Sequence, residues 1–202
     1  MVDTSPLTPQ ELTVGEGGRQ SPVPSSGGAD WRAVMPVPDD APPAPVDMVS
    51  LGKPWRTWAY RDRLGRLLFY MQRFNLTNGS KEFQPLAYFE HRRGVRRWRH
   101  KGVPSPYPLY GLQDLAAHPE AQVLVVEGEK TADAARVLFP EMVVTTSPFG
   151  SNAASKADWS PLAGRVVVVW PDHDAAGHTY GAAVAHFALT AGAASVKIVE
   201  VS

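Results

Sequence analysis

Three carboxylates stand at places in the sequence where a fold can use them for chemistry. Glu127 comes directly after the apolar run QVLVV, and Asp172 and Asp174 follow the apolar run VVVVW. Residues that follow buried strands lie at the carboxyl ends of a parallel sheet, which is where α/β proteins bind their ligands. If the two strands are neighbours, the three side chains converge in one crevice. Asp172 and Asp174 are two residues apart, so in extended backbone they share one side.

Carboxylate oxygens gathered in this way are ligands for hard cations. We therefore expect Glu127, Asp172 and Asp174 to be catalytic and to bind Mg²⁺ or Mn²⁺. Such an ion neutralises phosphate oxygens and stabilises the attacking and leaving groups of phosphoryl transfer. Structural roles are the alternative, since Asp174 is a good N-cap for the next helix. Glu127 or Glu129 could simply sit favourably near a helix N-terminus.

The basic residues are concentrated upstream of these carboxylates. The chain of 202 residues has no net charge, yet residues 55–102 carry 12 basic and 3 acidic side chains. Such a segment is typical of a polyphosphate partner, although it could also pair with acidic parts of its own chain. The dense run from Arg92 to Gly102 could likewise be an edge hairpin protected by its charge. The candidate nucleic-acid or nucleotide contacts are Arg73, Lys81, Arg96, Arg97, Arg99, Lys130 and Lys156.

Two folded segments and a tail would position these residues. Residues 1–54 are rich in proline and glycine, which predicts a disordered tail. Residues 55–118 form a small, basic, β-rich subdomain, in which TWAYRD and LLFYMQRF flank the turn RLGR as a β-hairpin. Its aromatic residues are expected to form its core rather than a platform for bases: Trp55, Trp58, Tyr60, Phe69 and Tyr70.

Residues 119–202 alternate short apolar strands with helices, which predicts an α/β fold with a parallel sheet and flanking helices. The runs QVLVV, MVVTTS, RVVVVW and SVKIVEV are the expected strands, and EKTADAARVLF and DAAGHTYGAAVAHFALTAG are the expected helices. Gly128 and Gly177 stand where the chain turns into these helices. The active residues are then expected at the carboxyl ends of the strands.

Composition excludes several classes of protein. The chain has no cysteine, which rules out disulfides, thiol nucleophiles, thiolate zinc sites and iron–sulfur clusters within it. No apolar run approaches the roughly 20 residues that span a bilayer, and the N-terminus lacks the pattern of a signal peptide. No Walker A sequence is present. We therefore expect a cytoplasmic protein with no membrane partner.

The acidic motifs resemble a known domain. VLVVEGEKTADAA followed by VVVVWPDHDAAG is similar to the two signature motifs of the Toprim domain, which DnaG-type primases, topoisomerases and some nucleases share. Upstream, AYRDRLGRLLFYMQRF, KEFQP and PLYGL resemble the start of the RNA-polymerase core of DnaG-type primases. Topoisomerases and Toprim nucleases lack this upstream series, so it favours a primase-like protein. The residues of the two acidic motifs resemble those of Toprim proteins from phages, plasmids and integrated elements.

The resemblance implies a function and a role for each matching residue. Glu127 matches the Toprim glutamate, Asp172 and Asp174 match the metal ligands, and Arg73 and Lys81 match basic residues that meet nucleotide or template. It implies RNA primer synthesis from ribonucleoside triphosphates on single-stranded DNA in replication, with a replicative helicase as a further partner. The zinc module of primases and the acidic motif beyond the last strand are not in these 202 residues. Against the resemblance, we therefore expect either a fragment or a reduced version of such a protein. The alternatives are a non-catalytic nucleic-acid-binding Toprim module of a helicase-primase and a Toprim nuclease.

Overall fold

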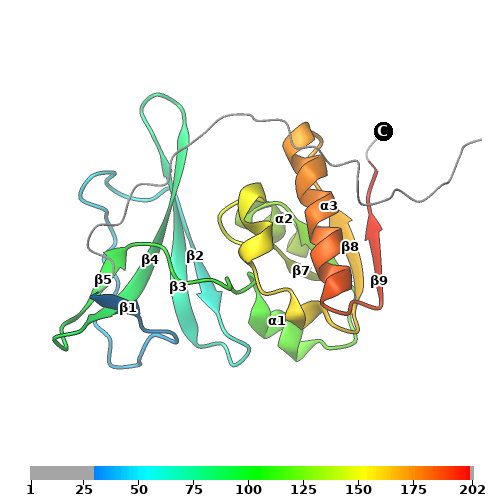
Figure 1. Cartoon of the computed structure of the whole chain (residues 1–202). Coiled ribbons are helices and arrows are strands. Elements are labelled where there is room, and N and C mark those ends of the chain that lie inside the picture. The colour runs from blue at the N-terminus through cyan, green and yellow to red at the C-terminus, as the bar shows by residue number, and fades with distance from the viewer. Residues whose placement is uncertain (1–29, 201–202) are drawn as a thin grey trace, which may run out of the picture.

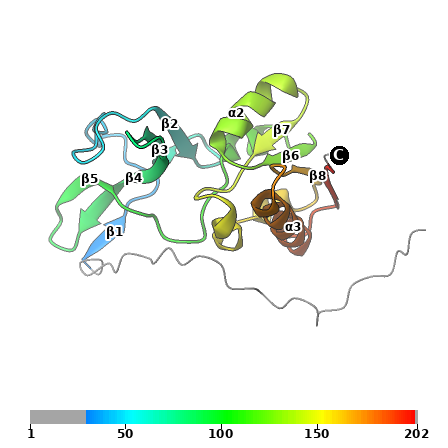
Figure 2. The ribbon, with the colours of Figure 1, turned by 90° about the horizontal axis from the view of Figure 1, so that it is seen from above.

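The computed structural model describes residues 30–200, which form two β-sheets that lie side by side (Figure 1). The first, here called the β-rich sheet, is antiparallel and precedes the second in the chain. The second, here called the parallel sheet, carries helices on its faces (Figure 2). The predicted α/β class with a preceding β-rich part is therefore confirmed.

The β-rich sheet has the strand order β1-β4-β3-β2, and β5 pairs with β4 as well. The hairpin expected around RLGR is present, because β2 and β3 pair across this turn. Asp62 Oδ1 closes the turn by accepting hydrogen bonds from the backbone amides of Leu64 and Arg66, at 2.9 and 3.0 Å. The strands are β1 (Trp31–Ala33), β2 (Arg56–Arg61), β3 (Leu67–Asn75), β4 (Lys81–His91) and β5 (Arg96–His100).

Residues 31–33 are a strand of this sheet and the segment after them is hydrogen-bonded to it, which corrects the prediction of a disordered tail through residue 54. β1 pairs with the end of β4, and the amide of Val37 donates to the carbonyl of Leu67 at 2.7 Å. Trp98 Nε1 donates to the carbonyl of Pro42 at 2.7 Å. A proline-rich segment with few apolar residues can still be ordered where a neighbouring sheet supplies its hydrogen-bond partners. Residues 1–29, covered by the same prediction, lie outside the described residues.

One face of the β-rich sheet packs against the α/β part of the molecule. Alternation along β2 and β3 puts Trp58, Tyr60, Phe69 and Met71 on this face, and all four are buried. The expected aromatic core is thus confirmed for Trp58, Tyr60 and Phe69, whereas Trp55 is half exposed. The α/β residues in the same cluster are Leu124, Val126, Ala132, Ala135 and Val144.

The parallel sheet has the strand order β7-β6-β8-β9. Its strands are β6 (Val123–Val126), β7 (Val143–Thr145), β8 (Val166–Trp170) and β9 (Ser195–Ile198). The helical elements are α1 (Leu112–Ala117), α2 (Glu129–Leu138), α3 (Ala175–Thr190) and the 3₁₀ turns η1 (Ser151–Lys156) and η2 (Ser160–Leu162). The strands and long helices predicted from the alternating pattern are all present.

Helices cover the two faces of the parallel sheet because its strands are apolar on both sides. Leu124 and Val126 of β6 pack in the cluster of α2, whereas Val123 and Val125 pack with Tyr180 of α3. Doubly covered strands of this kind are typical of parallel sheets. Within residues 30–200, none of the helices has the length and apolar character required to cross a membrane.

Candidate active site and nucleic-acid interface

Glu127 and Asp172 leave the parallel sheet from adjacent strands. β6 and β8 are hydrogen-bonded neighbours, and Val126 lies opposite Trp170 in their register. Glu127 follows Val126, and Asp172 follows Trp170 after one proline. The two acidic motifs therefore meet at the same edge of the sheet, because the two strands are neighbours, as the predicted convergence requires.

Glu127 carries a polar atom that the protein leaves unsatisfied. Its Oε2 is buried and, within the described residues, has no hydrogen-bond partner. Burial raises the pKa of the Glu127 carboxyl, and the negative charges of Asp172 and Asp174 raise it further. Buried polar atoms are nearly always paired, so one that is not points to a ligand or a chemical role.

The two aspartates are arranged differently from the extended segment that their spacing suggested. The amide of Asp174 donates to the carbonyl of Asp172 at 2.9 Å, so the chain turns between them. Asp174 is the N-cap of α3, and its Oδ1 accepts from the amide of Gly177 at 2.7 Å. This capping role was the structural alternative for Asp174. Asp172 and Asp174 both remain exposed.

Gly177 stands where the backbone folds back on itself at the start of α3. A Cβ added there would lie 2.1 Å from the carbonyl oxygen of Asp172. No side chain fits at that distance, so the turn between β8 and α3 needs a glycine at position 177. This close approach fixes the backbone that carries both aspartates.

The carboxylates match a hard cation in chemistry but do not yet surround one. In the described range 30–200, no group of three or more His, Cys, Asp or Glu side chains is arranged to hold a metal ion. The unpartnered oxygen of Glu127 and the exposed carboxylate of Asp172 are donors of the right kind for Mg²⁺ or Mn²⁺. Gathering three ligands around one ion requires rotation of the aspartate side chains.

A buried network holds the turn that presents Glu127. Gly128 has a φ of 79°, and its amide donates to Thr146 Oγ1 at 3.0 Å. The hydroxyl of Tyr180, on α3, lies 3.1 Å from Ser147 Oγ and 3.4 Å from the carbonyl of Val126. The ends of β6 and β7 are thereby tied to α3. No sequence motif marks Thr146, Ser147 or Tyr180, so sequence reasoning missed them.

Other charged residues near the two acidic motifs separate into buried and exposed groups. Glu129 is buried at the start of α2, and its Oε1 accepts from the hydroxyl of Tyr60 on β2 at 2.7 Å. Burial raises the pKa of Glu129, although the Tyr60 hydrogen bond opposes this shift. Lys130, on the first turn of α2, and Lys156, at the end of η1, are exposed. Glu129 therefore joins the two sheets, while both lysines remain accessible.

Arg73 and Lys81 lie on one face of the β-rich sheet, near the tip of the β3–β4 hairpin. Arg73 is opposite Phe83, and Lys81 is opposite Asn75. The Arg73 guanidinium lies 4.4 Å from the centre of the Trp55 ring, and its Nε donates to Asn75 Oδ1 at 3.1 Å. Within residues 30–200, neither cation forms an ion pair with a carboxylate, so both are available to a polyanion.

The three arginines of β5 do not form one patch. Arg96 pairs with Glu90 at 2.8 Å, and Glu90 also binds Arg32. Arg97 and Arg99 project to the opposite face, where their guanidinium carbons lie 4.6 and 4.5 Å from the centre of the Trp31 ring. Strand alternation separates them, since neighbouring side chains point to opposite faces. Only Arg97 and Arg99 therefore share the face of Arg73 and Lys81.

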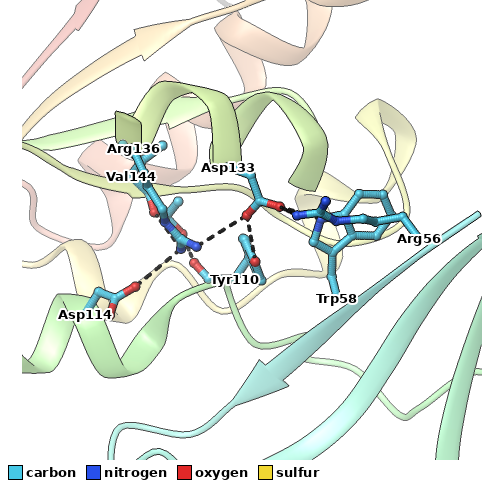
Figure 3. A network of polar contacts seen from close by, with 8 residues as sticks. Arg56, Trp58, Tyr110, Asp114, Asp133, Arg136 and Val144 are labelled. Carbon is cyan, nitrogen blue, oxygen red and sulfur yellow. Dashed lines mark hydrogen bonds and ion pairs between the residues drawn. The ribbon is translucent and has the colours of Figure 1, made fainter. Parts of the chain in front are cut away.

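A network centred on Asp133 joins the β-rich sheet to helix α2 (Figure 3). Asp133 Oδ2 accepts from Trp58 Nε1 at 2.8 Å and from Arg56 at 3.0 Å, and Oδ1 accepts from the hydroxyl of Tyr110 at 2.9 Å. Burial raises the pKa of Tyr110 to about 12, and its hydrogen bond to Asp133 contributes to this rise. Arg136 lies 3.6 Å from the same carboxylate. Asp133 is thus fully satisfied by donors from three parts of the chain.

Arg136 extends this network towards α1. It pairs with Asp114 at 3.4 Å and donates to the carbonyl of Val144 at 3.2 Å (Figure 3). One feature of the sequence could have indicated that α2 contacts the β-rich sheet: Glu129 and Asp133 are four residues apart and therefore share a face of this helix. That face is the one turned to the β-rich sheet. The network therefore fixes how the two sheets sit relative to each other.

Comparison with solved structures found primases, all at low identity. The primase fragment of the bacteriophage T7 primase-helicase is 15% identical, with a TM-score of 0.43, over 70% of this chain and 51% of that one. The E. coli primase catalytic core is 16% identical, with a TM-score of 0.43, over 70% and 42%. A DnaG primase catalytic domain bound to single-stranded DNA is 16% identical, with a TM-score of 0.42, over 70% and 43%. The match thus spans about half, or less, of each of these chains.

Comparison at the level of sequence gave a family without an assigned activity. No curated protein matches this sequence. One family profile matches residues 71–173, from β3 to the turn after β8, so it includes parts of both sheets together with Glu127 and Asp172. Because this match covers about half of the chain, the protein belongs to the family described as a domain of unknown function, DUF6371.

Proposed function

We propose that this chain is the core of a primase-like Toprim protein that joins ribonucleotides on single-stranded DNA with Mg²⁺ or Mn²⁺. The observation that carries the proposal is the buried, unpartnered carboxylate oxygen of Glu127 beside Asp172, at the ends of two adjacent parallel strands. A basic sheet face stands next to this edge. The similarity of the motifs to those of phage and plasmid Toprim proteins supports a role in replication of a mobile element. In this proposal the protein acts in the cytoplasm, beside a replicative helicase.

The residues divide the work by their surroundings. Glu127 suits the chemical step, because its buried Oε2 has no hydrogen-bond partner among residues 30–200 and burial raises its pKa. Asp172 is exposed and free to meet a ligand, whereas Asp174 also holds the start of α3. A bound Mg²⁺ or Mn²⁺ supplies positive charge that neutralises phosphate oxygens.

The cations of the β-rich sheet position the substrate in this proposal. Arg73 and Lys81 hold phosphates of the DNA strand or of a ribonucleoside triphosphate, because no carboxylate among the described residues neutralises them. Arg97 and Arg99 extend the same basic face, and Arg96 does not, since Glu90 occupies it. The exposed Lys130 and Lys156 are further phosphate contacts from the parallel-sheet side.

A non-catalytic module that only binds nucleic acid is a second candidate. The lack of a preformed three-ligand metal group in the described residues favours it. It predicts DNA binding that survives loss of the carboxylates and falls steeply with salt. A Toprim nuclease would use the same carboxylates and is distinguished by metal-dependent nicking of DNA.

The test is incorporation of labelled ribonucleotides on single-stranded DNA with Mg²⁺ or Mn²⁺. The double variant Asp172→Asn, Asp174→Asn is expected to lose the product. Asparagine also caps helices well, so this variant keeps the start of α3. Glu141→Gln, an exposed acid in the loop after α2, is the matched control and should retain activity. Product that is unchanged in the double variant would overturn the proposal, and absent product with intact DNA binding would favour the binding module.

A further inference from the structure

We infer that Trp55, Arg73 and Phe83 form a platform on which unpaired bases of a nucleic-acid strand stack. This inference deepens the proposed function, on which the choice of a single-stranded DNA occupant rests. It assigns a base-stacking role to two aromatic residues, of which Trp55 was expected in the core.

Exposed aromatic rings are the first observation. Trp55 is 50% exposed and Phe83 is 46% exposed, whereas Trp58, Tyr60 and Phe69 of the same sheet are each at most 3% exposed. Among residues 30–200, no second aromatic ring packs on Phe83, and its exposed surface is accessible to a ligand. Leaving two large apolar rings in water has a cost, which a stacking partner would remove.

The sheet register places Arg73 beside Phe83, and a side-chain contact places it beside Trp55. Arg73 on β3 is paired with Arg56 on β2 and with Phe83 on β4, so the side chains of Arg56, Arg73 and Phe83 project from one face of the sheet. Side chains in such directly opposite pairs have Cβ atoms roughly 5 Å apart. Arg73 lies 4.4 Å from the centre of the Trp55 ring. Arg73 thus has the Trp55 ring against its guanidinium and Phe83 opposite it in the sheet register.

Charge identifies the occupant. Arg73 and Lys81 have no carboxylate partner in the part of the chain that the structure describes. Lys81 precedes Phe83 by two residues on β4, so both side chains lie on the same face of the sheet. Flat rings set among uncompensated cations suit a polymer that carries both bases and phosphates. Proteins that bind single strands combine these two features, because every base has a face that can stack.

The strand that carries Arg73 is packed against the loop beside the carboxylates. Along β3, Phe69 is four residues from Arg73, which corresponds to about 13 Å of extended strand. Phe69 stacks on Phe149, 6.4 Å away between ring centres, and Phe149 stands in the loop that follows β7. That loop leaves the parallel sheet at the same edge as Glu127. Phe69 and the intervening Met71 are buried, so this packed contact connects the strand that carries Arg73 to the loop beside Glu127.

The test compares two DNA strands of equal length and charge, one with normal bases and one with abasic sites. Binding to the full chain is measured by fluorescence anisotropy without metal or nucleotide, so it is independent of catalysis. Trp55→Ala and Phe83→Ala are expected to weaken binding of the normal strand by about five- to a hundredfold each. Binding of the abasic strand should change by less than about twofold, because its stacking surface is already missing.

Two further variants keep the test sharp. Phe83→Leu retains apolar bulk without a ring and should lose affinity as Phe83→Ala does. Leu64→Ala, an exposed apolar residue on the β2–β3 turn, is the control and should bind both strands normally. Arg73→Ala should weaken both strands and lower the salt dependence by about one phosphate contact.

Several results would overturn the platform. These are equal losses on normal and abasic strands, unchanged binding in both aromatic variants, or displacement of the strand by free ATP at lower concentration than by an unlabelled strand. The last result would indicate a nucleotide pocket instead. The proposed catalysis is tested separately. A failure to incorporate ribonucleotides would not change the ratio of affinities for the normal and abasic strands, because that ratio is measured without metal or nucleotide.

Discussion

Two acidic residues six positions apart in the chain have opposite surroundings. Asp133 on α2 accepts hydrogen bonds from Arg56, Trp58 and Tyr110 and has Arg136 nearby. Glu127, just before α2, has a buried oxygen with no partner in the described residues. A buried polar group left unpaired lowers stability, so it persists where another role requires it. The contrast indicates that Asp133 stabilises the fold, and it supports the chemical role that we propose for Glu127.

The same contrast separates the basic residues. Arg96 is paired with Glu90, whereas Arg73 rests on an aromatic ring and has no carboxylate partner among residues 30–200. Residues of one type in one sheet therefore differ in whether their charge is already neutralised. Composition counts them equally, yet only the unpaired ones attract a polyanion. The expected consequences of this contrast follow from the largest effect to the smallest.

Glu127→Gln is expected to reduce ribonucleotide incorporation by about a hundredfold or more, because a positioned acid or base contributes that much to rate. The free energy of unfolding should stay the same or rise slightly, since a neutral amide replaces a partly buried carboxyl near two aspartates. Incorporation assays and urea unfolding check the two parts. A large loss of stability with unchanged turnover would reverse the assignment.

Asp133→Ala is expected to lower the free energy of unfolding by about 2–4 kcal/mol, because it leaves the buried Trp58 and Tyr110 donors without an acceptor. Asp133→Asn keeps one carbonyl oxygen and should lose less. Urea unfolding measures both. A change below about 0.5 kcal/mol in the alanine variant would show that the interface does not depend on this network.

Tyr180→Phe is expected to lower the free energy of unfolding by about 1 kcal/mol, the usual worth of a hydrogen bond. The phenyl ring keeps its packing in the core, so only the hydroxyl's contacts with Thr146, Ser147 and the Val126 carbonyl are lost. Thermal unfolding with Thr190→Ser, an exposed hydroxyl at the end of α3, as control measures the change. Equal stability of both variants would argue against a buried network beside Glu127.

The smallest expected effect is a pH dependence from His100. Burial lowers the pKa of His100, whose Nε2 lies 2.8 Å from Gln72 Oε1. The unfolded chain then binds a proton that the folded chain resists, so stability should fall as pH drops below the ordinary histidine pKa of about 6.5. His100→Gln can keep the contact without titrating. Melting temperatures at pH 7 and pH 5 should differ less in the variant than in the parent, and equal differences would exclude His100 as the cause.

Local pattern in the sequence was sufficient to predict most elements. The aromatic-rich runs TWAYRD and LLFYMQRF around the turn RLGR predicted the hairpin of β2 and β3, and the apolar runs before Glu127 and Asp172 predicted β6 and β8. Turn chemistry at Gly65 and Gly128 is also local. These features depend on neighbours a few residues apart, and so they can be read from the sequence alone.

The predictions for residues 31–33 and for Trp55 were wrong, because residues far away in the sequence determine the structure there. Residues 31–33 form a strand because β4 supplies its hydrogen bonds, some 58 residues further along in the pair of Arg32 with Glu90. Composition alone classified this segment with the tail. Trp55 was expected in the core because it is apolar, and nothing local shows that it lies at an exposed edge.

By itself, the sequence determined the element types, the position of three carboxylates after strands and the concentration of positive charge. Only the tertiary structure decided which charges remain unpaired. Asp133 meets Trp58 across 75 residues, and Arg96 and Arg97, adjacent in sequence, end on opposite faces. Pairing is a property of long-range contacts, because a side chain is neutralised by whatever the fold brings within a few ångströms of it.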